Sequence, residues 1–413
     1  MTASIYLDNG ATSFPKPPVV WQQMEHYIRD VGCNVNRGSY DKAYSAGSLV
    51  LETRERLCGL FGFDQPENVI FTANITASLN FILKGFLTSA DHVLVSGLEH
   101  NAVMRPLEQM GVAYSPIPGD VAGKIDGGPA GAAAMKALLR PNTKAVIISH
   151  GSNICGTLQP LETIGRFCQA EGLYFIVDSA QTAGVYPLDM ARMNIDALAF
   201  TGHKSLMGPQ GIGGFLIRPG LAEQLSPLIA GGTGSFSDSL IMPRLLPDRF
   251  EAGTPNLPGI YGLNGALSFL AATGPDKIRS HEERLARLFL DAIGEETGDG
   301  QTLRVAGENT DGAGIGTARA GARIAVAGGT DISGRAPVIS LDFLGLDNAE
   351  AAYALESRFG VMTRCGLHCS PLAHRTLGTF PQGTVRFSIG YYNTPEEILA
   401  AAEAVRQVAL GQT

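Results

Sequence analysis

Two cysteines lie four residues apart in the stretch RCGLHCSPLAH, residues 364–374. Cys365 and Cys369 could in principle bind a metal, form a disulfide, pack in a core or present a reactive thiol. A zinc site would need two more ligands, and Cys-x3-Cys with His368 and His374 matches the usual zinc spacing poorly. We therefore expect no metal site in this stretch.

The residues around these cysteines narrow the remaining alternatives. Gly366 and Pro371 predict a loop, which suits a reactive thiol at Cys369 better than a buried one. A buried structural role stays open for Cys365. A disulfide also stays open, because a turn of four residues can bring two Cα atoms within the range that a disulfide tolerates.

A second group of candidate residues follows a series of short apolar segments. In α/β proteins the chemistry lies at the carboxyl ends of the strands, so the side chains just past each segment are candidates. They are Thr76 after NVIFT, His100 after HVLVS, Asn153 after KAVIIS, Asp178 and Gln181 at and after the end of LYFIVD, and Thr201, His203 and Lys204 at and after the end of IDALAFT. Each alone has an ordinary structural explanation, such as a helix cap, a turn or a solvated charge.

Together these residues offer what pyridoxal phosphate needs. Lys204 supplies an amine for a Schiff base, Asp178 supplies an anion for the pyridinium nitrogen, and Thr76 opens a helix whose free N–H groups could hold a phosphate. A nucleotide-binding P-loop at Lys204 is excluded, because that motif needs GxxxxGK[ST] and His203 stands before the lysine here. The sequence thus favours a pyridoxal phosphate site over an NTPase.

The segments that position these residues repeat a short apolar run, a turn and a helical pattern, which is typical of βαβ units. Strands are expected at 68–72, 92–96, 144–149, 173–178, 195–201 and 212–217. Their continuous apolar character predicts a mostly parallel sheet that is covered by helices on both faces.

The pattern changes after residue 258. A long helical stretch through 298 precedes a glycine-rich segment at 306–334, and strands are expected at 338–343 and 384–390. We interpret the glycine-rich segment as a flexible surface excursion and not as a nucleotide loop, since its GAGIG lacks the full GxGxxG spacing. A smaller α+β domain is expected in this part of the chain.

Composition excludes several classes of protein. The 413 residues are 45% hydrophobic, and the net charge of -8 has the wrong sign for a surface that binds nucleic acid or an anionic membrane. No run approaches the roughly 18 apolar residues of a membrane span, and the N-terminus has no signal-peptide pattern, which predicts a cytoplasmic protein. Six cysteines are too few for a disulfide scaffold. Free and mostly buried thiols are expected at Cys33, Cys58, Cys155 and Cys168.

Motifs run along nearly the whole chain: YLDNGATSFPKP, NVNRG, EHN, SHGSN, DSAQ, TGHK, RFEAGTPN, RCGLHC and RFSIGYYNTPEE. With these motifs the chain resembles the class V aminotransferase family of pyridoxal phosphate enzymes, in particular its cysteine desulfurase and selenocysteine lyase branch. The short spacing from Arg364 to Cys369 is similar to the second desulfurase group, whose catalytic cysteine lies on a short structured loop.

The resemblance implies a role for each candidate residue. Lys204 would form the internal aldimine and move protons, Cys369 would attack the substrate sulfur as a thiolate, and His100 would stack on the ring and transfer protons. The cofactor would also be held by Thr76, Asn153, Asp178, Gln181, Thr201, His203 and, from a second subunit, Thr254. The substrate would be bound by Asn36, Asn153, Arg364 and Arg386.

Some positions depart from the pattern that is common in the family. Asn74 and Ile75 stand where Gly and Thr are commoner, which changes the phosphate-binding turn. Asn36 stands where close relatives often have His, and Cys365 is an extra thiol where Thr is commoner. The glycine-rich segment at 306–334 is longer than the family leads one to expect.

The resemblance implies an α/β protein of the PLP-dependent transferase fold type I, with a mostly parallel seven-stranded sheet in a large domain and a smaller α+β C-terminal domain. We expect the large domain over 15–258 and the small one over 259–413 together with 1–14.

The expected reaction converts L-cysteine to L-alanine and leaves a persulfide on the enzyme. The sulfur would pass to a sulfur-acceptor protein, as in iron–sulfur cluster assembly. A homodimer is expected, with no nucleic acid, membrane or metal as partner. The alternatives are a selenocysteine lyase, a cystine or cysteine C–S lyase of the same fold, and a non-catalytic scaffold.

Overall fold

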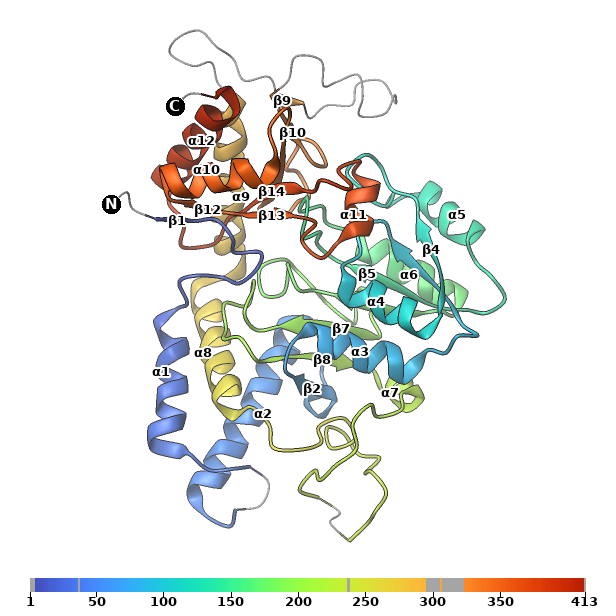
Figure 1. Ribbon diagram of the computed structural model, residues 1–413. Coiled ribbons are helices and arrows are strands. Elements are labelled where there is room, and N and C mark those ends of the chain that lie inside the picture. Colours follow the sequence, from blue (N-terminus) through green and yellow to red (C-terminus); the bar gives the residue numbers. More distant parts are fainter. Residues whose placement is uncertain (1–3, 36–37, 236–237, 295–304, 307–322, 412–413) are drawn as a thin grey trace.

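The computed structural model describes residues 4–35, 38–235, 238–294, 305–306 and 323–411. Within these residues the chain forms a larger sheet that is surrounded by helices and a smaller sheet at one end of it (Figure 1). The described N-terminal and C-terminal ends both lie beside the smaller sheet.

The larger sheet has seven strands in the order β2-β8-β7-β6-β5-β3-β4. Their bounds are β2 Val69–Thr72, β8 Gly213–Ile217, β7 Ala197–Thr201, β6 Tyr174–Asp178, β5 Thr143–Ser149, β3 His92–Ser96 and β4 Ala113–Ile117. Strand β8 is antiparallel to both of its neighbours, and the other pairs are parallel. The six strands predicted in this part of the chain, and the mostly parallel sheet, are confirmed.

Strand β4 is the member of this sheet that the sequence does not predict. Ser115 and Pro116 interrupt its apolar run. The strand lies at the edge of the sheet beside β3, where a proline without an N–H is tolerated.

Helices cover both faces of the larger sheet, as expected. One face carries α3 Ile75–Phe86, α4 Asn101–Met110 and α7 Pro219–Gln224, and the other carries α2 Asp41–Phe61, α5 Pro129–Ala137, α6 Leu161–Glu171 and α8 Leu257–Thr273. Successive strand residues point to opposite faces, so that Ile147 packs with the first group and Ile148 with the second. A strand that is buried on both sides must be apolar at every position, which explains the unbroken apolar runs.

Helix α1 and two single turns of other helix types, η1 and η2, also belong to this part of the molecule. Helix α1 (Pro18–His26), with the π-helical turn η1 (Tyr27–Val31), packs against α8. The 3-10 turn η2 (Pro66–Asn68) leads directly into β2.

The smaller sheet has five strands in the order β13-β14-β11-β10-β9. Their bounds are β13 Arg364–Gly366, β14 Thr384–Ser388, β11 Val338–Phe343, β10 Ile324–Val326 and β9 Val305–Ala306. The accompanying helices are α9 Pro275–Gly294, α10 Asn348–Phe359, α11 Pro371–Thr376 and α12 Pro395–Leu410. The strand predictions at β11 and β14 are confirmed.

Two expectations for this part of the chain need correction. The long helical stretch is two helices, α8 and α9, because Gly274 ends α8 with a φ of 90°. The glycine-rich segment is not all loop, since Ile324–Val326 forms strand β10, which pairs antiparallel with β11. The remaining glycine-rich residues 307–322, and residues 295–298 of the expected helix, lie outside the described residues.

The hydrophobic packing follows the two sheets. Core residues between 257 and 278 pack with the larger sheet, whereas those between 285 and 293 pack with the smaller one. The division of the chain into domains at 15–258 and 259–413, with 1–14, remains a prediction. The packing places α8 with the larger sheet and the end of α9 with the smaller one.

The N-terminal segment packs against the smaller sheet. Strand β1 (Ile5–Tyr6) pairs in parallel with β12 (Val361–Met362), and Leu7 is fully buried in the core of the smaller sheet. The chain then runs beside β14, where Asp8 forms an isolated parallel bridge with Ser388. The first motif of the sequence is thereby fixed next to a strand that lies more than 370 residues further along the chain.

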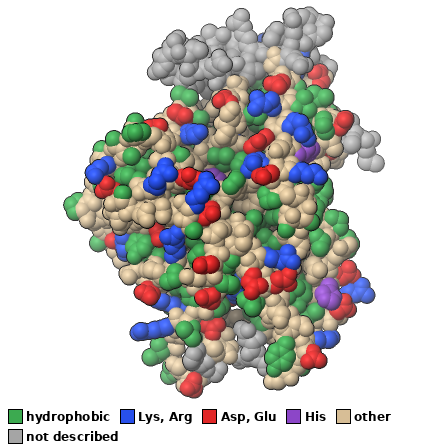
Figure 2. All heavy atoms as spheres, turned by 180° about the vertical axis from the view of Figure 1, so that it is seen from behind, with side chains coloured by type: hydrophobic (Ala, Val, Ile, Leu, Met, Phe, Trp, Pro, Cys, Tyr) green, Lys and Arg blue, Asp and Glu red, His purple; other side chains and the backbone are tan. Residues whose placement is uncertain are grey.

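Charged side chains of both signs are interspersed on the face shown in Figure 2, with hydrophobic side chains between them. Among the described residues, no helix is both long enough and apolar enough to cross a membrane.

Candidate active site

A cavity of ≈ 440 Å³ lies at the carboxyl edge of the larger sheet. Its volume is within the range of small-molecule sites. Eight of the predicted residues line it: Thr76, His100, Asn153, Asp178, Gln181, Thr201, His203 and Lys204. The parallel strands account for this convergence, because β3, β5, β6 and β7 all end at the same edge.

One end of the cavity is formed by the N-terminus of α3. The helix begins at Ile75, and the side chain of Asn74 caps it by accepting a hydrogen bond of 3.0 Å from Ala77 N. Asn74 is thus the cap residue, and the alternative explanation of Thr76 as an ordinary N-cap is wrong. The Thr76 side chain and the first N–H groups of the helix remain for an anion, which the helix dipole also favours.

Two buried polar atoms of residues that line the same cavity lack a hydrogen-bond partner among the described residues. Thr201 Oγ1 and His203 Nδ1 have no hydrogen-bond partner within the described part of the chain. Burial, with Lys204 and Lys16 nearby, lowers the pKa of His203 to about 4, so its neutral ring can present one N–H. Unpartnered buried polar groups are costly, and a phosphate would satisfy both.

The amine and the carboxylate of the site are held together by strand pairing. Asp178 ends β6, and Lys204 follows β7, the neighbouring strand. Burial lowers the pKa of Lys204 to about 8, against the opposite effect of Asp178. Burial raises the pKa of Asp178, while Lys204 and a hydrogen bond from Ala180 N act to lower it.

The hydrogen bonds of His100 fix its tautomer. His100 caps α4, and its Nδ1 accepts a hydrogen bond of 3.0 Å from Ala102 N. Burial, followed by the nearby cations Lys204 and Arg364, lowers its pKa to about 4. A neutral imidazole whose Nδ1 accepts a hydrogen bond must carry its proton on Nε2. His100 is therefore a hydrogen-bond donor through Nε2–H.

These features fit pyridoxal phosphate. The cavity offers Lys204 as the amine, Asp178 as the anion, and a helix N-terminus with two unpartnered polar atoms for the phosphate. Gln181 also lines the cavity, and its Nε2 donates to Gly10 O at 3.1 Å.

Cys369 lies on a tight turn after β13. His368 and Cys369 have φ angles of 47° and 60°, in the left-handed region that non-glycine residues seldom adopt. The turn is held on one side by Asn101 N, which donates to Cys369 O at 2.8 Å. Because Asn101 follows His100, a cavity residue, this backbone bond places Cys369, whose thiol is exposed, at the rim of the cavity.

Asn153 holds the same turn from the other side. Its Nδ2 donates to His368 O at 2.8 Å, and its Oδ1 accepts from Ser370 Oγ at 2.7 Å. Such contacts offset the cost of two left-handed residues. The sequence predicts Asn153 at the cofactor and substrate but does not reveal this contact with the cysteine turn.

Cys365 is exposed on β13, where it is the Cα partner of Val385. The alternative of a buried structural role for Cys365 is therefore wrong. Cys365 and Cys369 are both free thiols. The other four cysteines are buried and free, as expected.

Arg364 and Arg386 lie directly opposite each other on β13 and β14. Arg386 is buried, and its Nη1 donates to Asn153 O at 3.3 Å, which links it to the cavity wall. Both arginines act to lower the pKa of Lys204, so they lie within electrostatic reach of the amine.

The roles expected of Thr254 and Asn36 remain predictions. Thr254 is exposed and is not among the lining residues, so its role toward a second subunit remains a prediction. Asn36 lies outside the described residues.

Some polar residues contact the residues of the site although the sequence analysis does not predict a role for them. Glu99 is fully buried, and it accepts hydrogen bonds from Ser96 Oγ and from the N and Oγ of Ser149, which lines the cavity. Burial raises its pKa to about 7. Its position next to His100 in the motif LEHN is the feature of the sequence that could have indicated a role at the site. Asp8, which pairs with Arg386, is the other residue of this kind.

The sequence profile described as aminotransferase class-V matches residues 5–311 and 317–400. The chain belongs to the class-V aminotransferase family. Members of this family depend on pyridoxal phosphate, in agreement with the fit of the cavity to this cofactor.

Relatives of this class-V protein are similar over nearly its whole length. A probable cysteine desulfurase of Vibrio cholerae is 30% identical over 416 residues, which are 98% of this chain and 93% of the relative. One of Methanothermobacter thermautotrophicus is 28% identical and covers 98% of this chain and 94% of the relative.

Solved structures of class-V proteins show the same fold. The apo cysteine desulfurase of Thermococcus onnurineus NA1 has a TM-score of 0.83 at 28% identity, with 99% of this chain and 95% of that chain covered. The cysteine desulfurase CsdA of Escherichia coli, in an S-sulfonic acid form, has a TM-score of 0.80 at 26% identity with the same coverage. The PLP-dependent transferase fold type I is therefore confirmed.

The contacts of Asn153 predict how the cysteine turn is kept in place. Asn153→Ala removes both side-chain bonds to the turn, each worth about 1 kcal/mol. We expect faster hydrogen exchange at the Ser370 amide, which donates to Leu367 O within the turn. Hydrogen-exchange mass spectrometry of the peptide that contains 367–370 measures this.

A matched control is Asn142→Ala, which removes a side-chain bond to Ala90 O near the start of β5, at the opposite edge of the sheet. This variant should leave exchange in the turn unchanged. Equal protection of the turn in wild type and Asn153→Ala would show that Asn153 does not hold it.

Proposed function

We propose that the protein is a cysteine desulfurase that converts L-cysteine to L-alanine and keeps the sulfur as a persulfide on Cys369. The observation that carries this proposal is the position of the Cys369 turn. The backbone O of Cys369, whose thiol is exposed, accepts a hydrogen bond from Asn101 N at the rim of a cavity that contains Lys204 and Asp178. A pyridoxal phosphate enzyme without sulfur chemistry would have no use for a thiol fixed there.

The relatives support the substrate class. Those named above are called probable cysteine desulfurases, and the two solved structures are cysteine desulfurases. The reaction balances without an external oxidant: the sulfur of L-cysteine passes to the Cys369 thiol, which becomes a persulfide, and the carbon skeleton leaves as L-alanine.

The cofactor would be held by residues that the cavity already brings together. Lys204 would hold it covalently, Asp178 would pair with the ring nitrogen, and Gln181 would bond the ring hydroxyl. The phosphate would lie against Thr76, Thr201, His203 and the first turn of α3. When bound, pyridoxal phosphate supplies an electron sink for the bonds at the substrate Cα.

The remaining roles belong to the side chains themselves. Lys204, with its pKa lowered to about 8, carries a neutral fraction near pH 7 and can take and return a proton at the substrate Cα. His100 presents its Nε2 proton toward the cavity as a donor. Arg386, with Arg364 opposite, would hold the substrate carboxylate through its planar fork.

The thiol of Cys369 is presented by a turn that is already fixed. A turn with its backbone bonded on both sides loses little conformational entropy when the substrate arrives. Sulfur transfer to a second protein then requires only that Cys369 be reachable, and it is exposed.

A homodimer forms part of the proposal. Thr254 would reach the phosphate of a second subunit, since it is exposed in its own chain. The preceding segment exposes the large hydrophobic side chains Leu240, Ile241 and Leu245, which is unusual unless another surface covers them.

The reaction itself gives the first prediction. Protein loaded with pyridoxal phosphate should release L-alanine, and no pyruvate, from L-cysteine. L-selenocysteine, cystine and cysteine sulfinate should be assayed beside it, with alanine and pyruvate measured separately. Pyruvate as the main product would point to a C–S lyase, and turnover of L-selenocysteine alone to a selenocysteine lyase.

Lys204→Ala is the variant that belongs to this assay. It should abolish turnover, and borohydride treatment should no longer fix the cofactor to the chain, as measured by mass spectrometry. The control is Lys144→Ala. Lys144 lies over the ring of Phe86, far from the cavity, and its loss should leave turnover and cofactor attachment as in wild type. An active Lys204→Ala protein would refute the assignment of the amine.

The two cysteines of the turn give the second prediction. Cys369→Ala should lose alanine formation from L-cysteine by at least about 100-fold, because no nucleophile replaces it, while cofactor binding stays unchanged. Cys365→Ser should keep turnover. Mass spectrometry of protein treated with L-cysteine and digested without reductant should locate the persulfide on Cys369.

The same digest tests the relation between the two thiols. A Cys365 thiolate that reached the persulfide would displace sulfide and leave a disulfide to Cys369, and Cys365→Ser would abolish it. A persulfide found on Cys365 alone, or full activity of Cys369→Ala, would identify a different nucleophile.

The proposed dimer gives the third prediction. Thr254→Ala should weaken cofactor binding several-fold without changing sedimentation, since one phosphate contact is lost. The double variant Leu240→Asp with Ile241→Asp should shift sedimentation toward monomer and lose cofactor as a consequence. A wild-type monomer with full activity at assay concentration would exclude the shared site.

A further inference from the structure

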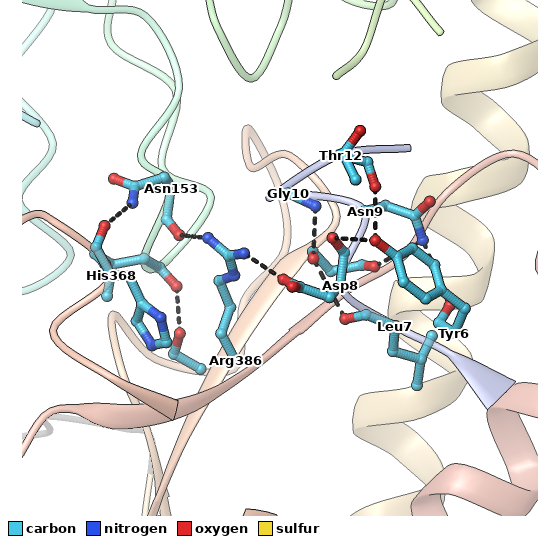
Figure 3. Close-up of polar contacts among 12 residues, drawn as sticks. Tyr6, Leu7, Asp8, Asn9, Gly10, Thr12, Asn153, His368 and Arg386 are labelled. Atoms are coloured by element: carbon cyan, nitrogen blue, oxygen red, sulfur yellow. Dashed lines mark hydrogen bonds and ion pairs between the residues drawn. The ribbon is translucent and has the colours of Figure 1, made fainter. Parts of the chain in front are cut away.

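Arg386 is buried and already holds a partner. Its side chain is 2% exposed, and its Nη2 donates to Asp8 Oδ1 at 2.5 Å (Figure 3). Its Nη1 donates to Asn153 O at 3.3 Å. The third nitrogen, Nε, is buried and has no hydrogen-bond partner among the described residues. A guanidinium that is held at two nitrogens and unsatisfied at the third is suited to bind one more anion.

The position of Asp8 is fixed by its neighbours on both sides. Ser388 N donates to Leu7 O at 2.7 Å, Asn9 N donates to Ser388 O at 3.2 Å, and Gly10 N donates to Ser388 Oγ at 2.7 Å. Figure 3 shows the N-terminal segment from Tyr6 to Gly10, with Asp8 directed toward Arg386. Because the backbone on both sides of Asp8 is hydrogen-bonded to β14, its carboxylate is held next to the guanidinium of Arg386.

Gly10 allows this close approach. A Cβ at this position would lie 3.2 Å from Arg386 Cζ and 3.1 Å from Ser388 Oγ. The N-terminal segment therefore runs directly against the guanidinium, and the carboxylate two residues earlier meets it at hydrogen-bond distance.

The local charges explain why a carboxylate stands here. Arg364 and Arg386 are directly opposed on neighbouring strands, an arrangement that is destabilising without an anion. Asp8 neutralises one of the two positive charges. One unmatched positive charge remains, which equals the charge of a single substrate carboxylate.

We propose that Asp8 is a positioning residue for substrate binding: it holds the Arg386 guanidinium in the orientation that accepts the α-carboxylate of the amino-acid substrate. The inference rests on the proposed function, in which Arg386 binds that carboxylate. Asp8 acts through Arg386 and does not touch the reacting atoms. It also connects the carboxylate site to the cysteine turn, because Arg386 bonds Asn153, which in turn bonds His368 O.

The test compares ligands with and without a carboxylate. L-alanine, the proposed product, and ethylamine, which is L-alanine without its carboxylate, are titrated into pyridoxal-phosphate-loaded protein and followed by visible absorption. Asp8→Ala should weaken L-alanine binding on the order of tenfold or more, as expected for loss of a charge-assisted contact, and leave ethylamine binding within about twofold.

Two further variants sharpen the comparison. Asp8→Asn keeps an acceptor oxygen for Arg386 Nη2 but loses the charge, and should bind L-alanine with an affinity between wild type and Asp8→Ala. Asp91→Asn is the matched control, since its carboxylate is 19% exposed against 21% for Asp8 and pairs with Lys144 at the other end of the sheet. This control should leave both titrations unchanged.

Steady-state kinetics with L-cysteine give an independent readout. The KM of Asp8→Ala should rise on the order of tenfold while kcat changes less, because Lys204 and Cys369 are not contacted by Asp8. If Asp8→Ala does not fold, Asp8→Asn carries the same comparison, with a smaller loss of L-alanine affinity than a full truncation would give.

The outcomes separate the two proposals. A wild-type protein that makes no L-alanine from L-cysteine contradicts the desulfurase, whatever Asp8 does. With an active wild type, unchanged or tighter L-alanine binding in Asp8→Ala and Asp8→Asn overturns the positioning role. Equal weakening of L-alanine and ethylamine also overturns it, because the effect would then be a general loss of structure.

Discussion

Burial of the Lys204 ammonium at the edge of the larger sheet is the constraint on which the rest of the site depends. An unpaired buried cation is costly, and burial lowers the pKa of Lys204 to about 8. The pairing of β6 with β7 supplies the compensating anion, because Asp178 ends one strand and Lys204 follows the other. Arg386 and Arg364 each make the lysine harder to protonate. The number of cations that the site can hold in their charged form therefore depends on the carboxylates that compensate them.

Neither sheet contains the complete site. The larger sheet forms the cavity, whereas Arg364 and Arg386 come from β13 and β14, and Cys369 comes from the turn between β13 and α11. The hydrogen bonds that join the two parts include Asn101 N to Cys369 O, Asn153 Nδ2 to His368 O, and Arg386 Nη1 to Asn153 O. These bonds involve backbone atoms on at least one side. The relative position of thiol and cavity is thus set by the chain itself and not by flexible side chains alone.

Local signals made much of this predictable from the sequence. Apolar runs marked most strands of the larger sheet, and the rule that parallel strands end at one edge brought Lys204 and Asp178 together in advance. The failures have physical causes. Strand β4 is an edge strand whose apolar run is interrupted by Ser115 and Pro116. Strand β10 is apolar but has only three residues, within a glycine-rich segment, which is too short to indicate a strand. The contacts of Asn153 and Asp8 join residues more than 200 positions apart, and no local pattern encodes such pairs.

The charges of the site also connect Asp8 to Lys204. The cations Lys204, Arg364 and Arg386 interact with one another, and the carboxylates Asp178 and Asp8 act against them. A substrate carboxylate bound at the arginines would offset the positive charge that lowers the pKa of Lys204, so that this pKa would rise toward its ordinary value. Lys204 would then be a stronger base when the substrate is in place than before it arrives. Removing Asp8 acts in the opposite direction, because it leaves the positive charge of Arg386 without its partner. The Asp8 carboxylate therefore influences the buried amine of Lys204 through Arg386, although the two residues lie beside different sheets.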